Sequence, residues 1–203
     1  MKKYAVLHEP GDIVTLAGTR FVVLDVERRG SLPDSLFLLA LESVGASEFG
    51  SSNNYAESDL KKAVDKWLED MGKRGLDNAK LIPREIDLTT LDGSGCYGKL
   101  SVKAAPLTLD EAREYADIIP NAERWCWLAT GWSGPSKSDG DLALYVYSSG
   151  DWNYGICSYS YGIRPALKIP SDLLLDSADK PDLSEVPTDT LLEEIRRRVV
   201  DKA

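Results

Sequence analysis

One segment with a clear helical period constrains the fold of this 203-residue chain most strongly. Behind Ser58 and ahead of Gly72, apolar side chains recur in steps of three and four residues, at Leu60, Val64, Trp67, Leu68 and Met71. Such steps place side chains on one face of an α-helix, and serine is a favoured N-cap residue. The pattern predicts an amphipathic helix whose apolar face packs into the core.

Short apolar segments around this helix predict strands. Residues 12–17 and 20–26 flank a turn at Gly18-Thr19, which indicates a hairpin, and residues 35–41 form a short apolar segment typical of a buried strand. After the helix and a mixed region over 76–104, further strands are predicted at 124–130, 142–147, 153–157 and 163–169, with a polar loop over 131–141.

A second helix is predicted from Thr108, because Thr108 and Glu111 have the spacing of a capping box. It is expected to end before Pro120 and to bury one side, formed by Ala112, Tyr115, Ala116 and Ile119. The fold class that follows is α+β, with two helices packed on a twisted, mostly antiparallel sheet with long loops.

The C-terminal part of the sequence has a different character. Residues 1–169 are predicted to form the domain, 170–187 a linker rich in Asp, Ser and Pro, and 188–203 a helix that Thr190 and Glu193 would cap. Because a short helix is marginal in water without a partner, two interpretations remain open. It either docks on the domain or serves as a handle for oligomerisation or attachment to a larger particle.

Charge and composition exclude several classes of function. A net charge of −9 argues against a nucleic-acid binder, which would need a basic face. No stretch has the ~18 apolar residues of a membrane span, and the N-terminus lacks the apolar region of a signal peptide. Three cysteines, Cys96, Cys126 and Cys157, without a CxxC spacing favour a reducing compartment. We therefore expect a cytoplasmic or virion-associated protein.

Residues for familiar chemistry are missing. His8 is the one histidine, so a histidine triad or a multi-histidine metal site is ruled out, and His8 is expected at the surface. The sequence has no GxGxxG, P-loop or nucleophile elbow. We predict no catalytic residue, no metal site and no cofactor. Arg164 lies in an apolar strand, where a buried guanidinium needs acceptors, so it is expected to clamp loop carbonyls or a carboxylate.

The segment 145–161, YVYSSGDWNYGICSYSY, has an unusual composition. It holds five of the nine tyrosines and four serines but only one charged residue, Asp151, although 28% of the chain is charged. Rigid tyrosine mixed with adaptable Ser, Gly and Asn is typical of a binding surface, whereas an ordinary sheet also favours aromatic residues. Alternation predicts that Val146 faces inward and Tyr145 and Tyr147 outward, with a hairpin tip at 149–151.

Several short motifs resemble those of prokaryotic C-type-lectin-like domains. They are WCWLAT (125–130), ALYVYSSG (143–150) and GIRPALKI (162–169), with NNYAESDLKKAVDKWL (53–68) and APLTLDEAREY (105–115) similar to the two helices of that family. The resemblance covers residues 10–169. This fold is similar to that of formylglycine-generating enzymes and of the variable proteins of diversity-generating retroelements.

In those variable proteins, a reverse transcriptase rewrites adenines in a segment just before the end of the domain, so AAC-like codons become codons for Asn, Tyr, Ser, Asp, Gly or Cys. Residues 145–161 contain no Lys, Glu, Gln or Met, and Trp152 alone falls outside the reachable residues. The resemblance therefore implies a ligand-binding protein with a diversified surface. The sequence motifs that form the Ca²⁺ site of animal lectins do not occur here with their residues in the required order, so no such site is expected.

The predicted ligand is a protein or other macromolecule. The residues predicted to contact it are Tyr145, Tyr147, Asp151, Trp152, Asn153, Tyr154, Tyr159 and Tyr161, with Ser148, Ser149 and Ser158 as adaptable hydrogen-bonding groups and Trp132 and Ser133 at the border of the surface. Two alternatives remain: an oxidase of the formylglycine-generating type that uses Cys126 and Cys157, and a structural particle protein whose aromatic segment packs subunits together.

Overall fold

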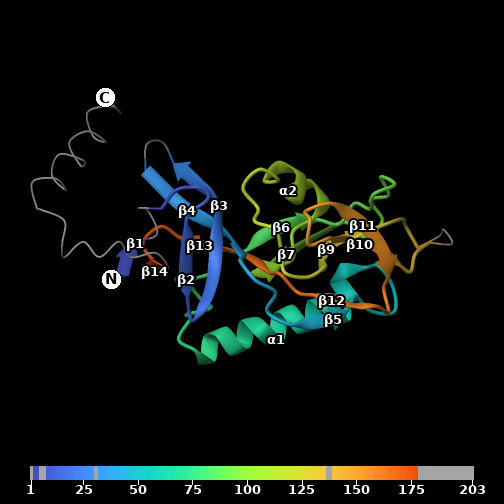
Figure 1. Cartoon of the computed structure of the whole chain (residues 1–203), viewed down its shortest axis with the longest axis horizontal. Helices are drawn as coiled ribbons and strands as arrows, with labels where there is room; N and C mark the ends of the chain where they lie inside the picture. The colour runs from blue at the N-terminus through green and yellow to red at the C-terminus, as the bar shows by residue number, and fades with distance from the viewer. Residues whose placement is uncertain (1, 5–7, 30–31, 136–138, 178–203) are drawn as a thin grey trace, which may run out of the picture.

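The computed structural model of the chain describes residues 2–4, 8–29, 32–135 and 139–177 (Figure 1). These residues form an α+β fold with two α-helices and mostly antiparallel sheets, as the sequence predicts at this level. Figure 1 shows the larger sheet on the left, a smaller one on the right, and the two helices on opposite sides. The predicted C-terminal helix over 188–203 lies outside the described residues.

The larger sheet has seven strands, and every neighbouring pair is antiparallel. Its spatial order is β1 (Lys2–Tyr4), β14 (Leu174–Ser177), β2 (Ile13–Leu16), β3 (Thr19–Arg29), β4 (Leu32–Ala40), β13 (Ala166–Pro170) and β8 (Ala104–Ala105). Strand β14 lies between β1 and β2, so the prediction of a linker from residue 170 onward is wrong for residues 174–177. The composition indicated a linker because Asp and Ser surround this short strand, and its pairing with β1 and β2 cannot be seen in the local sequence.

The turn between β2 and β3 differs by one residue from the predicted one. Leu16 pairs with Thr19, so Ala17 and Gly18 are the two turn residues, with φ of 47° and 78°. A two-residue turn with positive φ at both positions matches the twist of the flanking strands. Glycine adopts this conformation freely, whereas an L-residue such as Ala17 adopts it at a cost.

The smaller sheet has five strands. Their order is β11 (Trp152–Ile156), β10 (Leu142–Val146), β9 (Cys126–Gly131), β12 (Ser160–Gly162) and β5 (Ala46–Glu48). β12 runs parallel to β9, and the other pairs are antiparallel. All six residues of β9 are buried, because this central strand has a hydrophobic cluster on each face. A two-stranded ribbon of β6 (Arg84–Asp87) and β7 (Lys99–Val102) completes the fold.

Helix α1 (Asp59–Lys73) confirms the prediction from its helical period. Ser58 caps it by accepting a hydrogen bond from the Lys61 amide at 2.9 Å. Leu60, Val64 and Met71 are buried against both sheets' shared core. A single 3₁₀ turn, Tyr55–Glu57, leads into it.

Helix α2 (Leu109–Glu114) has the predicted capping box but is shorter than expected. The amide of Thr108 donates to Glu111 at 2.8 Å, and the Glu111 amide donates to the Thr108 hydroxyl at 3.2 Å. After Glu114 the regular helical bonding ends: the amides of Ala116 and Ile118 donate to carbonyls three residues back, at Arg113 and Tyr115, so the chain tightens into turns. This change leaves Ala116 exposed, contrary to the predicted inward face.

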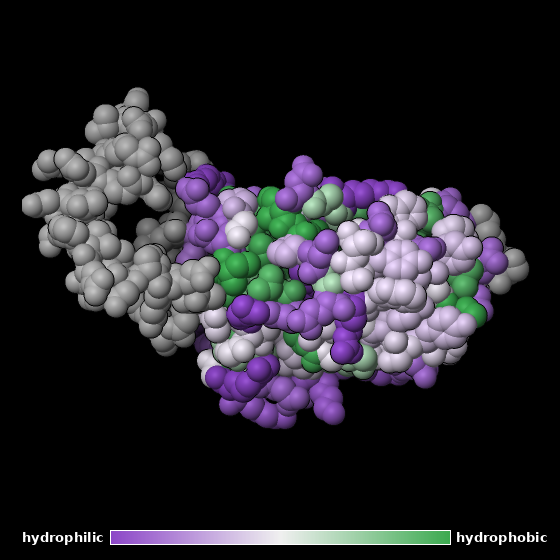
Figure 2. All heavy atoms as spheres, in the orientation of Figure 1, coloured by the Kyte–Doolittle hydropathy of each residue, from purple (hydrophilic) through white to green (hydrophobic). Residues whose placement is uncertain are grey.

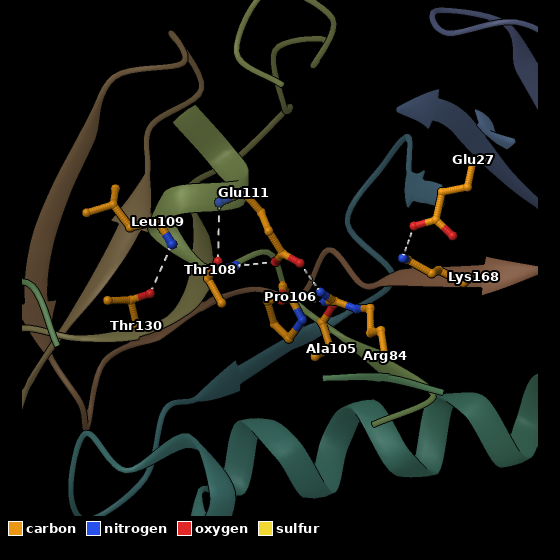
Figure 3. Close-up of polar contacts among 9 residues, drawn as sticks. All are labelled: Glu27, Arg84, Ala105, Pro106, Thr108, Leu109, Glu111, Thr130 and Lys168. Carbon is orange, nitrogen blue, oxygen red and sulfur yellow. Dashed lines mark hydrogen bonds and ion pairs between the residues drawn. The ribbon is translucent and has the colours of Figure 1, made fainter. Parts of the chain in front are cut away.

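An ion pair and a set of hydrogen bonds hold α2 on the sheets (Figure 3). The buried Arg84 pairs with Glu111 and donates to the carbonyls of Ala105 and Pro106 at 3.1 Å each. The amide of Leu109 donates to the Thr130 hydroxyl at 2.9 Å, which ties the helix to β9. Because these contacts use backbone groups and side chains together, the position of α2 is firmly set.

The prediction that His8 lies at the surface is wrong. Its side chain is buried, and Nδ1 lies 3.3 Å from a carboxylate oxygen of Asp12. The neighbouring Glu9 and Pro10 suggested an exposed segment and are exposed, but the segment is joined to β3 by a hydrogen bond from the Gly11 amide to the Val23 carbonyl.

We expect Glu27 to make a small, pH-dependent contribution to the free energy of unfolding. Its carboxylate pairs with Lys168, which joins β3 to β13 (Figure 3), and accepts a hydrogen bond from the Ser35 hydroxyl at 2.6 Å. The hydrogen bond from Lys168 and that from Ser35 lower the pKa of Glu27 below its usual 4.5. A lowered pKa in the folded state stabilises the fold above the unfolded value, and this contribution disappears as the pH falls through the folded value.

Glu27→Gln should therefore cost less than about 1 kcal/mol at pH 6, because the carboxylate is nearly half exposed. Urea denaturation of the wild type and the variant at pH 6 and pH 3 measures this loss in the free energy of unfolding. A loss that is equal at both values would contradict the assignment to the charged carboxylate.

Candidate functional site

Five aromatic side chains from the smaller sheet pack together into what we call the aromatic cluster: Trp125, Trp127, Tyr145, Tyr147 and Tyr161. Ring centroids lie 4.5 Å apart for Trp127 and Tyr161, and 4.6 Å for Tyr145 and Tyr161. Trp125 stacks on Tyr145 at 5.4 Å with an interplanar angle of 13°. Contact distances and tilts of this kind stabilise packed aromatic rings.

Tyr145 does not face outward as predicted. It is 4% exposed, between Asn153 on β11 and Trp127 on β9. Burial raises its pKa above the ordinary tyrosine value. Alternation along β10 could not reveal this, because both faces of the smaller sheet are covered, and Val146 packs against the hydrophobic cluster on the opposite face.

A second group of residues is exposed, and we call it the β11 surface: Trp152, Tyr154 and Ile156 on β11, with Tyr159 in the turn that follows the strand. Each is between 39% and 50% exposed. In the described part of the chain these are four of the five large hydrophobic side chains with this much exposure, the fifth being Trp125. Figure 2 shows mostly near-white residues over β10–β12, in contrast to the purple hydrophilic residues elsewhere on this face.

Strand β11 explains the alignment of this surface. Trp152, Tyr154 and Ile156 are alternate residues on the edge strand of the sheet, so they lie on one face. Tyr154 packs on Trp132 with centroids 4.2 Å apart, and the Arg113 guanidinium lies 5.4 Å from the Trp152 ring centre. Ile156 is not among the contact residues predicted from the sequence, because the burial of an edge strand depends on its neighbours.

The predicted hairpin tip lies between β10 and β11. The amide of Tyr147 donates to the Asp151 carbonyl at 2.7 Å, Gly150 has φ of 94°, and the Ser149 hydroxyl donates to the Asp151 carboxylate at 3.0 Å. Asn153 donates to the Tyr147 hydroxyl at 2.8 Å. The tip therefore presents a short, internally bonded set of polar groups beside the β11 surface.

The remaining predicted site residues divide by exposure. Ser148, Ser149, Asp151 and Ser158 are exposed, and Trp132, Tyr147, Asn153 and Tyr161 are half-buried. Ser133 is buried, so of the two residues predicted at the border of the binding surface only Trp132 is accessible there. The structure thus joins the tip and the β11 surface, whereas Tyr145 and Ser133 lie in the interior.

The two cysteines of the oxidase alternative lie in surroundings that disfavour the thiolate form. Cys126 and Cys157 are buried and free, and Cys96 is exposed and free. Burial raises the pKa of Cys126 to about 11 and that of Cys157 to about 12. Because the thiolate is the nucleophile, these shifts act against reactivity at neutral pH. Within the described ranges, no three His, Cys, Asp or Glu side chains gather as metal ligands would.

Arg164 has the predicted clamping role. Its Nε donates to the Ala40 carbonyl at 2.7 Å and its Nη1 to the Pro120 carbonyl at 2.9 Å. These bonds connect the end of β4 to the segment that follows α2. The position of Arg164 just before Pro165 and β13 allows the side chain to span the two.

Of the helices that the structure describes, none is long and apolar enough to cross a membrane. Comparisons with protein families, with characterised proteins and with solved structures found no match to this chain. The residues and contacts described above are therefore the basis for assigning a function.

Proposed function

We propose that this chain is a ligand-binding protein without catalytic activity, which contacts a protein or another macromolecule through the β11 surface and the adjacent hairpin tip. The observation that carries the proposal is the alignment of Trp152, Tyr154 and Ile156 on one edge strand, all substantially exposed, followed along the chain by the exposed Tyr159. Large exposed apolar groups gathered in one place normally mark an interaction site.

The chemistry of this surface suits recognition. Aromatic side chains offer a large contact area with few rotors to order, and they are enriched among the residues that dominate binding energy. Ser148, Ser149 and Ser158 beside them supply hydrogen-bonding groups that adapt to different partners. The absence of Lys and Glu from residues 145–161 agrees with the depletion of charge at interface centres.

We further propose that the fold is C-type-lectin-like and that a retroelement diversifies the exposed positions. In support, two of the motifs that carry the resemblance lie on strands that build the site, WCWLAT on β9 and ALYVYSSG on β10, and GIRPALKI runs from the end of β12 into β13 of the larger sheet. The restricted alphabet of residues 145–161 is the second support. DNA sequencing beside the gene tests it: we expect a near-copy of the coding segment for 132–161, mismatched at adenines, and a reverse transcriptase gene. Without them the diversification proposal fails.

A triple variant, Tyr154→Ser, Ile156→Ser and Tyr159→Ser, tests the binding surface. We expect it to stay folded, with a total loss of about 2 kcal/mol, because exposed positions contribute little. Two ring contacts are lost, that of Tyr154 with Trp132 at 4.2 Å and the wider one of Tyr159 with Tyr161 at 6.3 Å. Urea denaturation measures this loss. A much larger loss would show that these side chains belong to the core.

The same variant should no longer retain the ligand. Immobilised wild-type and variant proteins are compared for what each retains from extracts of the source organism, after crosslinking and mass spectrometry. The matched control is Lys61→Ser, Lys62→Ser and Lys66→Ser on α1, away from this surface. If all three proteins retain the same partners, the β11 surface is not the binding site.

A further inference from the structure

A cavity of about 450 Å³ lies between α2, the segment 119–122 and the smaller sheet. Its walls are mostly apolar and include Leu107, Leu109, Ile119, Leu128 and Val146. Small-molecule sites in proteins are typically concave, apolar and about 300–1,000 Å³ in volume, with a few polar groups that fix orientation. The cavity has the size and lining of such a site.

The polar group inside is Arg164, which is 7% exposed and lines the cavity. Two of its nitrogens bind carbonyls, as described above, whereas Nη2 is buried and has no hydrogen-bond partner among the described residues. A buried donor without a partner costs free energy, and the cost is larger on a charged group. Burial also lowers the pKa of Arg164, the direction expected for a cation removed from water.

The charged residues that line the cavity are all positive. Among its lining residues, all of which the structure describes, two are arginines, Arg164 and Arg113, and none is acidic. Arg113 lies at the opening, on the exposed side of α2, where it covers the Trp152 ring and pairs with Asp110 at 3.5 Å. The buried guanidinium therefore favours an anionic acceptor supplied from outside the protein.

The type of anion follows from the number of donors. One free nitrogen of Arg164 can satisfy a carboxylate, whereas a phosphate dianion needs several donors. The rest of the lining is mostly apolar, with Asn121, Tyr147 and Ser149 as its neutral polar residues and Arg113 as its second cation. We propose that this cavity binds a small apolar carboxylic acid, with its hydrocarbon part between α2 and the sheet and its carboxylate on Nη2 of Arg164. The site goes beyond the proposed function. It borders the β11 surface, because Trp152 and the tip residues Ser149 and Gly150 also line it, but Tyr154, Ile156 and Tyr159 do not.

Octanoate and the neutral octanol are the probes for the full chain. Trp127 and Trp152 line the cavity, so tryptophan fluorescence and calorimetry can both follow binding. We expect octanoate to bind with a Kd below about 1 mM and octanol at least about tenfold more weakly, because the alcohol lacks the charge-assisted hydrogen bond. The NMR resonances of the Arg164 side chain should shift with octanoate and not with octanol. Equal affinities, or no binding of octanoate, would overturn the proposal.

Two variants locate the site without removing Arg164, whose loss would also release two backbone carbonyls. Ala112→Phe places a ring from α2 into the cavity and should weaken octanoate binding at least about tenfold. Glu114→Phe adds the same ring on an exposed position of α2 that does not line the cavity and should leave the Kd unchanged. Unchanged binding by Ala112→Phe would place the ligand elsewhere.

The wild-type NMR shifts provide an answer even if Ala112→Phe fails to fold, because they locate the carboxylate directly. The proposal about the cavity and the proposal about the surface can be tested independently, because each has its own variant. The triple serine variant at 154, 156 and 159 should bind octanoate normally, and Ala112→Phe should still retain the macromolecular ligand.

Discussion

Trp127→Ala should lower the free energy of unfolding by about 3–5 kcal/mol, the range for removing a large buried aromatic side chain. Trp127 is 1% exposed and contacts the rings of Phe49, Tyr145 and Tyr161. Its indole N–H donates to the Ser47 carbonyl at 3.0 Å, so the change leaves both a cavity and an unsatisfied acceptor. Urea denaturation followed by far-UV circular dichroism measures the effect.

Trp125→Ala is the matched control. It removes the same side chain from the same aromatic cluster, but Trp125 is 42% exposed, so we expect a loss of about 1–2 kcal/mol. Equal losses for the two variants would mean that the aromatic cluster is uniformly exposed or uniformly packed, contrary to the structure. The result also bears on diversification, since Tyr145 and Tyr161 pack on Trp127 and cannot vary as freely as Tyr154 or Tyr159.

Arg84→Met should cost about 3 kcal/mol or more. The Arg84 side chain is almost fully buried and is the partner of Glu111 as well as the donor to two backbone carbonyls. Methionine keeps much of the volume but removes every donor, which leaves a partly buried carboxylate without its cation. The loss should appear in urea denaturation at neutral pH, together with weaker protection of the α2 amides in hydrogen exchange.

The double variant Arg84→Met with Glu111→Gln separates charge from packing. Glutamine can still accept from the Thr108 amide, so the capping box remains, and the double variant should lose less than the sum of the two single losses. Thr108→Ala serves as a reference for the cap alone, at about 1 kcal/mol. Strict additivity would show that Arg84 and Glu111 do not act as a pair.

Local chemistry in the sequence was sufficient to predict the helices and their starts. Ser58 and Thr108 cap helices because their hydroxyls accept from backbone amides a few residues on, and this needs no tertiary structure. The end of α2 could not be predicted in the same way. Nothing in residues 115–119 breaks a helix, and the tight turns there come with the packing of this segment against the sheets.

The candidate site was predicted in composition but not in arrangement. The Tyr-rich segment does lie together, yet which tyrosine is exposed depends on what covers each face of the sheet. Tyr145 is buried because β9 and β11 flank it, and Ile156 is exposed because β11 has no neighbour on its outer side among the described strands. The cavity beside Arg164 is lined by segments far apart in sequence, so no local pattern could indicate it.

The position of β13 and β14 in the larger sheet has a consequence for biosynthesis. β13 inserts between β4 and β8, and β14 inserts between β1 and β2, so strands late in the described part of the chain pair with strands early in it. Contacts this distant in sequence slow folding, since long loops must close before the contacts stabilise anything. A ribosome that has made the chain only as far as Pro165 therefore carries β4 with an open edge, which is a template for wrong pairing until β13 has been made.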